Sequence, residues 1–256
     1  MAVSRLTLAM AKPYLSIIIP AYNEAESIPK TLVDMDRYFS AVSYSYEIIV
    51  VNDGSEDNTA EVAVAMTKTV KNLKLIDNKE NKGKGAVVKQ GMLAATGAVR
   101  LFTDADNSTS IDQFEKMMPY FLGGEKHCDV VIGSRAVKGA VLDPAEPWYR
   151  QVLGKAGNLI IQILLLPGLW DTQCGFKAFT AEAAEKIFGI SRVAGWGFDV
   201  EALALAKKMG YRIREIPVHW VAAARSRVKA STYIRVLLET MTIRWRFWTN
   251  GYTILT

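Results

Sequence analysis

The chain has 256 residues, of which 50% are hydrophobic and 22% are charged, so it can bury one core of the size common among α/β domains. The net charge of +5 indicates an anionic partner, although charge alone does not distinguish nucleic acid, a phosphorylated substrate and a membrane surface. Cys128 and Cys174 are far apart and lack metal-binding spacing, which argues against a disulfide or zinc site and predicts buried free thiols.

We expect no signal peptide and no membrane-spanning helix. The N-terminal stretch, MAVSRLTLAMAKPY, is apolar only over a short distance and is interrupted by Arg5 and Thr7. The longest apolar run, from Leu159 to Trp170, contains Gln162 and Pro167 and is shorter than the ~20 residues that a helix needs to cross a bilayer.

Apolar, β-rich runs alternate with helical patterns through the first half of the chain. This alternation predicts an α/β fold with βα units and a mostly parallel sheet flanked by helices. Because the runs are apolar almost throughout, both faces of the sheet are expected to be covered. The predicted strands are Ser16–Ile19, Glu47–Val51, Leu73–Ile76, Ala98–Phe102 and Val130–Ile132.

Polar or charged segments follow every one of these strands. Each segment taken singly is explained by a turn, a helix start or a solvated face. Five in succession predict a binding edge, because ligands of open α/β sheets collect outside the carboxyl ends of the strands. The glycine-containing segment matches neither GxxxxGK[ST] nor GxGxxG, which argues against a P-loop kinase and a nicotinamide enzyme. The segments are Pro20–Glu24 (PAYNE), Asn52–Ser55 (NDGS), Asn78–Gly85 (NKENKGKG), Asp104–Asp106 (DAD) and Gly133–Arg135 (GSR).

Asp104 and Asp106 are the candidate metal ligands. Two carboxylates separated by one residue in an extended chain point to the same side, and hard cations such as Mg²⁺ and Mn²⁺ prefer oxygen ligands shared with a phosphate. The alternative is a loop in which Asp and Asn hydrogen-bond their own backbone, which is common for this pattern.

Together, PAYNE, NDGS, NKGKG and DAD resemble the family 2 glycosyltransferases, whose GT-A fold binds a nucleotide sugar with a divalent metal. In the second half, Asp171–Lys177 (DTQCGFK) and Trp196–Glu201 (WGFDVE) are similar to the polyprenyl-phosphate sugar synthases. Within these, DTQCGFK and GSR look closest to the dolichyl-phosphate β-glucosyltransferases. The resemblance implies transfer of glucose from UDP-glucose to a polyprenyl or dolichyl phosphate on the cytoplasmic face of a membrane.

The resemblance also implies roles for individual residues. Asp104 and Asp106 would hold Mg²⁺ or Mn²⁺, and Ser108 stands where many relatives of the mannosyl branch have a glutamine ligand. The nucleotide sugar would be bound by Pro20, Ala21, Tyr22, Glu24, Asp53, Lys82, Lys84 and Asp104. Phosphate or acceptor binding would fall to Arg135, Arg150, Trp196, Ser226, Arg227 and Lys229. The implied catalytic residues are Asp104, Asp106, Asp199 and Arg135.

The acceptor chemistry requires no strong base. A lipid phosphate has a second pKa of about 6 and already presents an anionic oxygen at neutral pH. Asp199 is therefore expected either to orient a substrate or to act as a base. The alternative is a structural role, in which its charge stabilises the start of a helix predicted from residue 196. One displacement would invert the sugar and give a β-linked product.

A C-terminal helix over Thr232–Trp248 is predicted to lie in a membrane interface. Arg235, Glu239, Thr242 and Arg246 recur at steps of four, three and four and form a narrow polar stripe, while the rest of the surface is mostly apolar or aromatic. The alternatives are a core helix and an oligomer contact. We expect a glycosyltransferase domain over residues 1–225, with an apolar helix near 150–168, followed by an interface helix over 226–256 of a peripheral enzyme.

Two further readings remain open from the residues. One keeps the fold but uses GDP-mannose as donor or a growing polysaccharide as acceptor, and a panel of donors and acceptors separates these. The other is a non-catalytic module that binds nucleic acid or an anionic membrane. Acidic residues at the strand ends and the lack of a recognisable RNA or DNA motif argue against nucleic acid.

Overall fold

The computed structural model describes residues 12–144, 148–222 and 230–253, while the side chains of residues 148–153, 230 and 231 lie outside the description. The main sheet has seven strands in the order β3-β2-β1-β4-β7-β5-β8. β7 runs antiparallel to β4 and β5, and the other neighbouring pairs are parallel. The strands are β1 (Leu15–Ala21), β2 (Tyr46–Asp53), β3 (Leu73–Asn78), β4 (Val99–Thr103), β5 (Val130–Ser134), β7 (Phe176–Thr180) and β8 (Ile213–Pro217).

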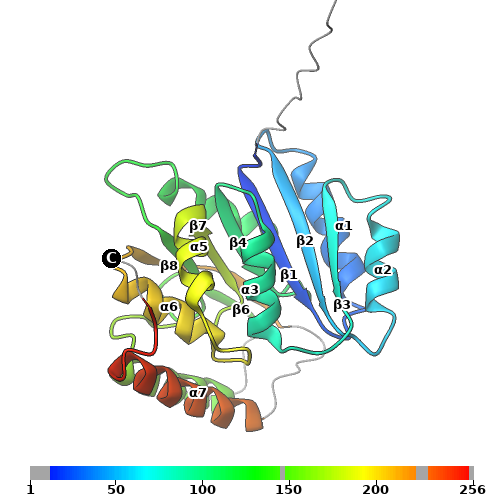
Figure 1. The fold of residues 1–256 in the computed structure, drawn as a ribbon. Coiled ribbons are helices and arrows are strands. Elements are labelled where there is room, and N and C mark those ends of the chain that lie inside the picture. The colour runs from blue at the N-terminus through cyan, green and yellow to red at the C-terminus, as the bar shows by residue number, and fades with distance from the viewer. Residues whose placement is uncertain (1–11, 145–147, 223–229, 254–256) are drawn as a thin grey trace, which may run out of the picture.

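The predicted mostly parallel sheet and its five predicted strands are confirmed. β1, β2, β4 and β5 are almost entirely buried, because helices cover both faces of the sheet. One face packs against α1 (Ile28–Phe39), α2 (Thr59–Met66) and two 3₁₀ segments, η1 (Ile111–Lys116) and η2 (Met118–Tyr120). The other packs against α3 (Lys84–Ala94), α5 (Ala181–Ile190) and α6 (Phe198–Lys208) (Figure 1).

The amino ends of the strands are joined by a buried carboxylate. Glu47, at the start of β2, accepts hydrogen bonds from Ser16 Oγ at 2.6 Å and from Lys74 Nζ at 2.7 Å. The backbone N–H of Thr96 donates to the same carboxylate at 2.8 Å. Glu47 therefore links β1, β2, β3 and the turn before β4 at the edge opposite the predicted site.

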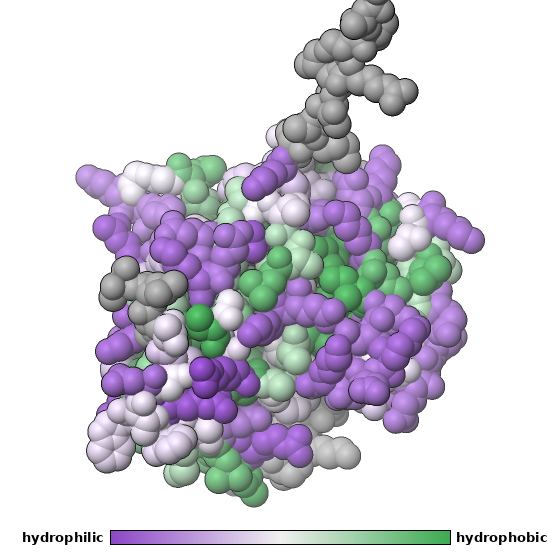
Figure 2. Space-filling model, viewed as in Figure 1, coloured by the Kyte–Doolittle hydropathy of each residue, from purple (hydrophilic) through white to green (hydrophobic). Residues whose placement is uncertain are grey.

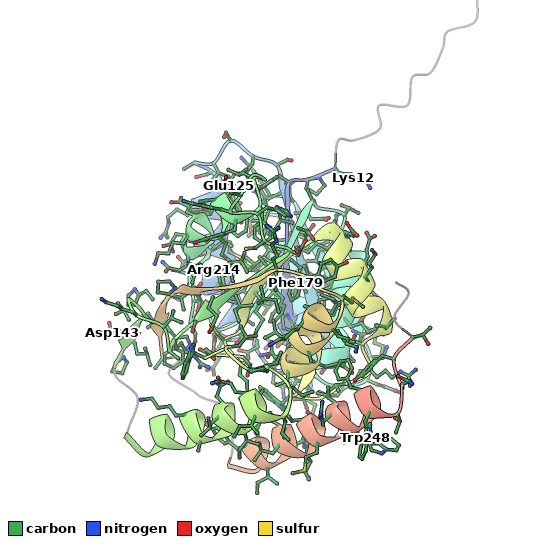
Figure 3. All side chains as sticks on the ribbon, turned by 90° about the vertical axis from the view of Figure 1, so that its left-hand side faces the viewer. Lys12, Glu125, Asp143, Phe179, Arg214 and Trp248 are labelled. Atoms are coloured by element: carbon green, nitrogen blue, oxygen red, sulfur yellow. The ribbon has the colours of Figure 1, made fainter. Side chains whose placement is uncertain are left out.

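Two helices, α4 (Trp148–Leu164) and α7 (Ala230–Trp248), lie side by side outside the sheet (Figure 3). α7 runs along the lower edge of the molecule in Figure 1, at the end toward which the parallel strands run. α4 ends earlier than the predicted residue 168, because Pro167 cannot continue the helix and Gly168 adopts a φ of +90°. A small parallel pair, β6 (Val141–Asp143) and β9 (His219–Val221), completes the described strands.

The four residues of the predicted polar stripe on α7 differ in their environments. Glu239 and Arg246 turn inward toward α6 and the loop before it, whereas Arg235 and Thr242 are exposed. The outward face of α7 is apolar instead, and Figure 2 shows hydrophobic residues at the lower edge where α7 lies. This face consists of Ile234, Leu238, Met241, Trp245 and Trp248, which are 59% to 85% exposed.

α4 adds apolar side chains to this exposed surface. Leu159, Ile160 and Ile163 are 40% to 75% exposed, and Trp170 in the following turn is 60% exposed. We call these residues and the outward face of α7 the apolar end face. None of the helices that the structure describes is long and apolar enough to cross a bilayer.

Both cysteines are free thiols, as predicted, but only one of them is buried as predicted. Cys174 is buried before β7, whereas Cys128 is half-buried in the segment before β5. Burial raises the pKa of the Cys174 thiol to about 12, so this side chain stays protonated at neutral pH.

Candidate active site

The turns after β1 and β2 are bound to each other at the carboxyl edge of the sheet. Asn23 adopts a φ of +54°, and its Oδ1 accepts the backbone N–H of Glu56 at 2.8 Å. The N–H of Glu24 donates to Thr59 Oγ1 at 2.7 Å. Pro20 and Ala21 end β1 directly before Tyr22, and the N–H of Asn23 donates to Ser55 Oγ at 2.9 Å, so the PAYNE and NDGS segments form one continuous wall.

Asp53 at the end of β2 anchors the glycine loop before α3. Its Oδ1 accepts the N–H of Lys82 at 2.7 Å, and its Oδ2 accepts the N–H of Gly83 at 3.1 Å. Burial raises the pKa of the Asp53 carboxyl, while these two donors act in the opposite direction. A contact of Asp53 with a nucleotide stays a prediction. In the structure, its carboxylate holds the backbone of the glycine loop in place.

Lys84, the first residue of α3, reaches the DAD segment. Its Nζ lies 2.6 Å from Asp104 Oδ1 and 5.2 Å from the centre of the Trp196 ring. Burial alone would lower the pKa of the Lys84 ammonium, but the carboxylates of Asp104, Asp199 and Asp106 outweigh it and raise this pKa. Lys84 is therefore a fixed positive charge at the centre of the edge.

Asp104 and Asp106 follow β4 with their carboxylates held by neighbouring elements. Asp106 Oδ1 accepts the N–H of Ser108 at 3.0 Å. A Cβ on Gly175 would overlap Asp104 Oδ2, so only glycine leaves room for this carboxylate. Burial and the negative charge of Asp104 raise the pKa of Asp106, against the hydrogen bonds from Ser108 and the charge of Lys84.

This donor set fits a hard divalent cation. The two acids supply the oxygen ligands that Mg²⁺ and Mn²⁺ prefer, and their mutual repulsion would be relieved by the cation. Within the described ranges, no group of three or more His, Cys, Asp and Glu side chains is placed to hold a metal ion. A metal bound by Asp104 and Asp106 would therefore take further oxygen ligands from phosphate and water.

Asp199 lies in the first turn of α6 and forms a buried ion pair. Its Oδ1 lies 2.6 Å from Lys177 Nζ, and Lys177 also donates to the carbonyl oxygen of Cys174 at 2.5 Å. Burial raises the pKa of the Asp199 carboxyl, against the effect of the Lys177 and Lys84 ammonium groups. Asp199 thus does more than stabilise a helix start, since it neutralises a lysine that is wholly inaccessible to solvent.

Arg135, directly after β5, is paired with Asp171. Its Nε donates to Asp171 Oδ2 at 2.8 Å and its terminal nitrogen to Oδ1 at 3.0 Å. Burial alone would raise the pKa of Asp171, but the guanidinium outweighs it and lowers this pKa. The N–H of Asp171 is in turn accepted by Glu215 of β8 at 2.9 Å. A phosphate-binding role for Arg135 stays a prediction, and the structure adds the carboxylate that orients it.

Some predicted acceptor residues fall outside the described part of the chain. Ser226, Arg227 and Lys229 lie between residues 222 and 230, and only the backbone of Arg150, in α4, is described. Conversely, no individual role was predicted for Asp171, Gly175 or Lys177, although all three belong to the DTQCGFK segment. The available signal was a charged residue at each end of an otherwise uncharged motif.

An open α/β sheet that gathers two carboxylates and a lysine outside its carboxyl ends is suited to a phosphate-rich ligand bound through a cation. This arrangement is typical of α/β enzymes that act on phosphate-rich ligands. The family model described as glycosyl transferase family 2 matches residues 16–188. The chain belongs to this family and is a glycosyltransferase, not a non-catalytic binding module.

Within the family, the chain is similar in sequence to dolichyl-phosphate β-glucosyltransferases and similar in fold to a solved glycosyltransferase structure. The chain is 35% identical to a dolichyl-phosphate β-glucosyltransferase of Dictyostelium discoideum, over 91% of this chain and 75% of the relative. It is 30% identical to the enzyme of that name from Homo sapiens, over 94% of this chain and 78% of the relative. The GT-A fold is shared with glucosyl-3-phosphoglycerate synthase from Mycobacterium tuberculosis, solved with Mn²⁺, UDP and glucosyl-3-phosphoglycerate. This match has a TM-score of 0.67 at 18% identity and covers 91% of this chain and 80% of that chain.

Proposed function

We propose that this enzyme transfers glucose from UDP-glucose to a dolichyl or related polyprenyl phosphate, with inversion, at the cytoplasmic face of a membrane. The names of the curated relatives support the sugar and the acceptor. The observation that carries the proposal is the Lys84, Asp104 and Asp106 cluster after the end of β4, at the end of the sheet where Figure 1 shows α7. The residues assigned to the nucleotide sugar and the surface assigned to the lipid would therefore lie at one end of the protein.

The donor side of the site would stabilise the negative charge of the nucleoside diphosphate leaving group. A Mg²⁺ or Mn²⁺ ion held by Asp104 and Asp106 would stabilise the departing nucleoside diphosphate as a Lewis acid. Lys84 adds a positive charge beside the same carboxylates, fixed there by the glycine loop that Asp53 anchors. We assign the nucleoside to the wall formed by the PAYNE turn and the end of β2, at Pro20, Ala21, Tyr22, Glu24 and Asp53.

The acceptor side needs to orient an anion and does not need to deprotonate it. The lipid phosphate attacks the anomeric carbon with an oxygen that is already ionised at neutral pH. Arg135, oriented by Asp171, is assigned to this phosphate together with Arg150, Trp196, Ser226, Arg227 and Lys229. Asp199 is committed to Lys177, so we assign it a positioning task and not that of a general base.

We further propose that the apolar end face lies in the headgroup region of the membrane, which makes the enzyme peripheral. Exposed Trp, Leu, Ile and Met side chains on two adjacent helices form the kind of surface that inserts shallowly at an interface. The segment 226–256, which contains α7, would bind the membrane interface and hold the glycosyltransferase domain of residues 1–225 there. The phosphate of a membrane-bound lipid would then lie at the same level as the active site.

The direct test of this function supplies the purified protein with dolichyl phosphate, Mn²⁺ and one nucleotide sugar at a time. Mass spectrometry of the lipid fraction should detect a hexosyl lipid phosphate with UDP-glucose and much less product with GDP-mannose. A product formed preferentially from GDP-mannose would replace the donor assignment. No glycolipid with any donor, from protein that is folded and binds Mn²⁺, would refute the proposed reaction.

A further inference from the structure

α7 contributes a carboxylate to the loop that borders the donor site. Glu239 points inward from α7, and its Oε2 accepts the backbone N–H of Gly197 at 2.5 Å. A Cβ on Gly195 would overlap Glu239 Oε1, and one on Gly197 would lie 2.8 Å from Oε2. The two glycines therefore make room for this carboxylate, in a loop formed by residues 192–197.

The 192–197 loop contacts the start of α3, which carries the lysine that pairs with Asp104. The carbonyl oxygen of Ala194 accepts the N–H of Gly85 at 2.8 Å, at the start of α3. The Trp196 ring lies 5.2 Å from the ammonium of Lys84, which is itself 2.6 Å from Asp104. A displacement of the loop would therefore move the ring, the first turn of α3 and the lysine together.

The other end of the same loop is held by α6 and by the segment that follows α7. Glu201, which is wholly buried, accepts the N–H groups of Arg192 at 2.9 Å and Val193 at 2.8 Å. The hydroxyl of Tyr252 donates to Glu201 at 2.6 Å. Glu201 fixes the entry to the loop, which leaves Glu239 as the carboxylate that fixes its Gly195–Gly197 end among the described contacts.

We propose that Glu239 is a positioning residue of the donor site: it holds the 192–197 loop so that Trp196 and Lys84 are set against Asp104. The inference rests on the proposed function, because it assigns the diphosphate of a nucleotide sugar to Lys84. Glu239 touches no reacting atom and acts through the loop. α7, which carries part of the apolar end face, would thus also support the proposed nucleotide site through Glu239.

The test measures nucleotide binding without lipid or sugar transfer. Calorimetry of the full chain with UDP and Mn²⁺ should give a Kd about tenfold weaker for Glu239→Ala, because a hydrogen bond to a charged acceptor is lost. Glu239→Gln keeps an acceptor oxygen without its charge and should lose only about threefold. In turnover assays the effect should fall on KM for the nucleotide sugar, with kcat changed less.

A matched control removes a glutamate that does not reach the loop. Glu182 is exposed on α5 and pairs with Lys186 at 2.7 Å, so Glu182→Ala should leave the Kd for UDP unchanged. Binding by folded Glu239→Ala within twofold of the native value would overturn the inference. If the alanine variant does not fold, native affinity in Glu239→Gln would overturn it instead. Failure of the native protein to bind either UDP or GDP with Mn²⁺ would refute the proposed function, and this inference with it.

Discussion

Breaking the ion pair between Lys177 and Asp199 should destabilise the enzyme strongly. Lys177 is wholly buried on β7, and its ammonium has two acceptors, Asp199 Oδ1 at 2.6 Å and the carbonyl oxygen of Cys174 at 2.5 Å. Removing one partner leaves an uncompensated charge in the interior, which costs about 3–5 kcal/mol. This is a large part of the ~5–15 kcal/mol by which a native domain is stable.

The two single variants and the double variant separate charge from packing. Lys177→Met and Asp199→Leu should each lose about 3–5 kcal/mol of unfolding free energy at pH 7, because each leaves one buried charge. The double variant replaces both charges by apolar side chains of similar length and branching, so its loss should be smaller than either single loss. Urea unfolding followed by far-ultraviolet circular dichroism measures all three.

The pH dependence of Lys177→Met provides a second check. Burial already raises the pKa of Asp199, and removal of the ammonium would raise it further. A carboxyl whose pKa is higher in the folded state than in the unfolded state loses stability as the pH rises between those two values. The destabilisation of Lys177→Met should therefore be smaller at pH 5 than at pH 8. Single variants that lose less than about 1 kcal/mol, or a double variant that loses the sum, would refute the reasoning.

Three other predictions concern separate parts of the molecule. Gly175→Ala should weaken Mn²⁺ binding in calorimetry by roughly tenfold or more, a shift of about 1.4 kcal/mol, because the new Cβ displaces the Asp104 carboxylate; unchanged affinity would contradict that packing. Burial would raise the pKa of Glu47, but hydrogen bonds from Lys74 and other donors outweigh it and lower the pKa from 4.5 to about 2. Glu47 thus adds about 3 kcal/mol above pH 5 that is lost toward pH 2, and Glu47→Gln should flatten this part of the stability curve in urea unfolding. A double change of Trp245 and Trp248 to Ser should reduce co-sedimentation with anionic vesicles several-fold without changing Kd for UDP, and undiminished sedimentation would count against the apolar end face.

The carboxyl edge of the sheet could be predicted from the sequence because its signals are local. PAYNE, NDGS and DAD each follow an apolar strand, and a parallel sheet brings such ends together whatever the details of packing. The structure accordingly places Lys84 against Asp104, which are 20 positions apart in the chain. Family resemblance then supplied the chemistry that the edge could carry.

The partners of individual side chains could not be predicted, because they depend on tertiary packing. No periodicity indicates that Asp53 binds the loop before α3, or that Lys177 is neutralised by a residue of α6. The helical pattern of α7 was correct, but periodicity does not say which face turns inward, and it could not show that Glu239 and Arg246 of the polar stripe pack against α6 and the loop before it. Packing on α4 and α6 decides that orientation.

Under the proposed function, Asp104 and Asp106 support metal-assisted transfer of glucose to a lipid phosphate. The most direct measurement follows labelled glucose from UDP-glucose into dolichyl phosphate by the native protein and by Asp106→Ala, with Mn²⁺ and with a chelator. We expect β-linked product from the native protein with metal, and a loss of at least a hundredfold in the variant or on chelation, about 2.7 kcal/mol of transition-state stabilisation. Full activity of folded Asp106→Ala would contradict the account.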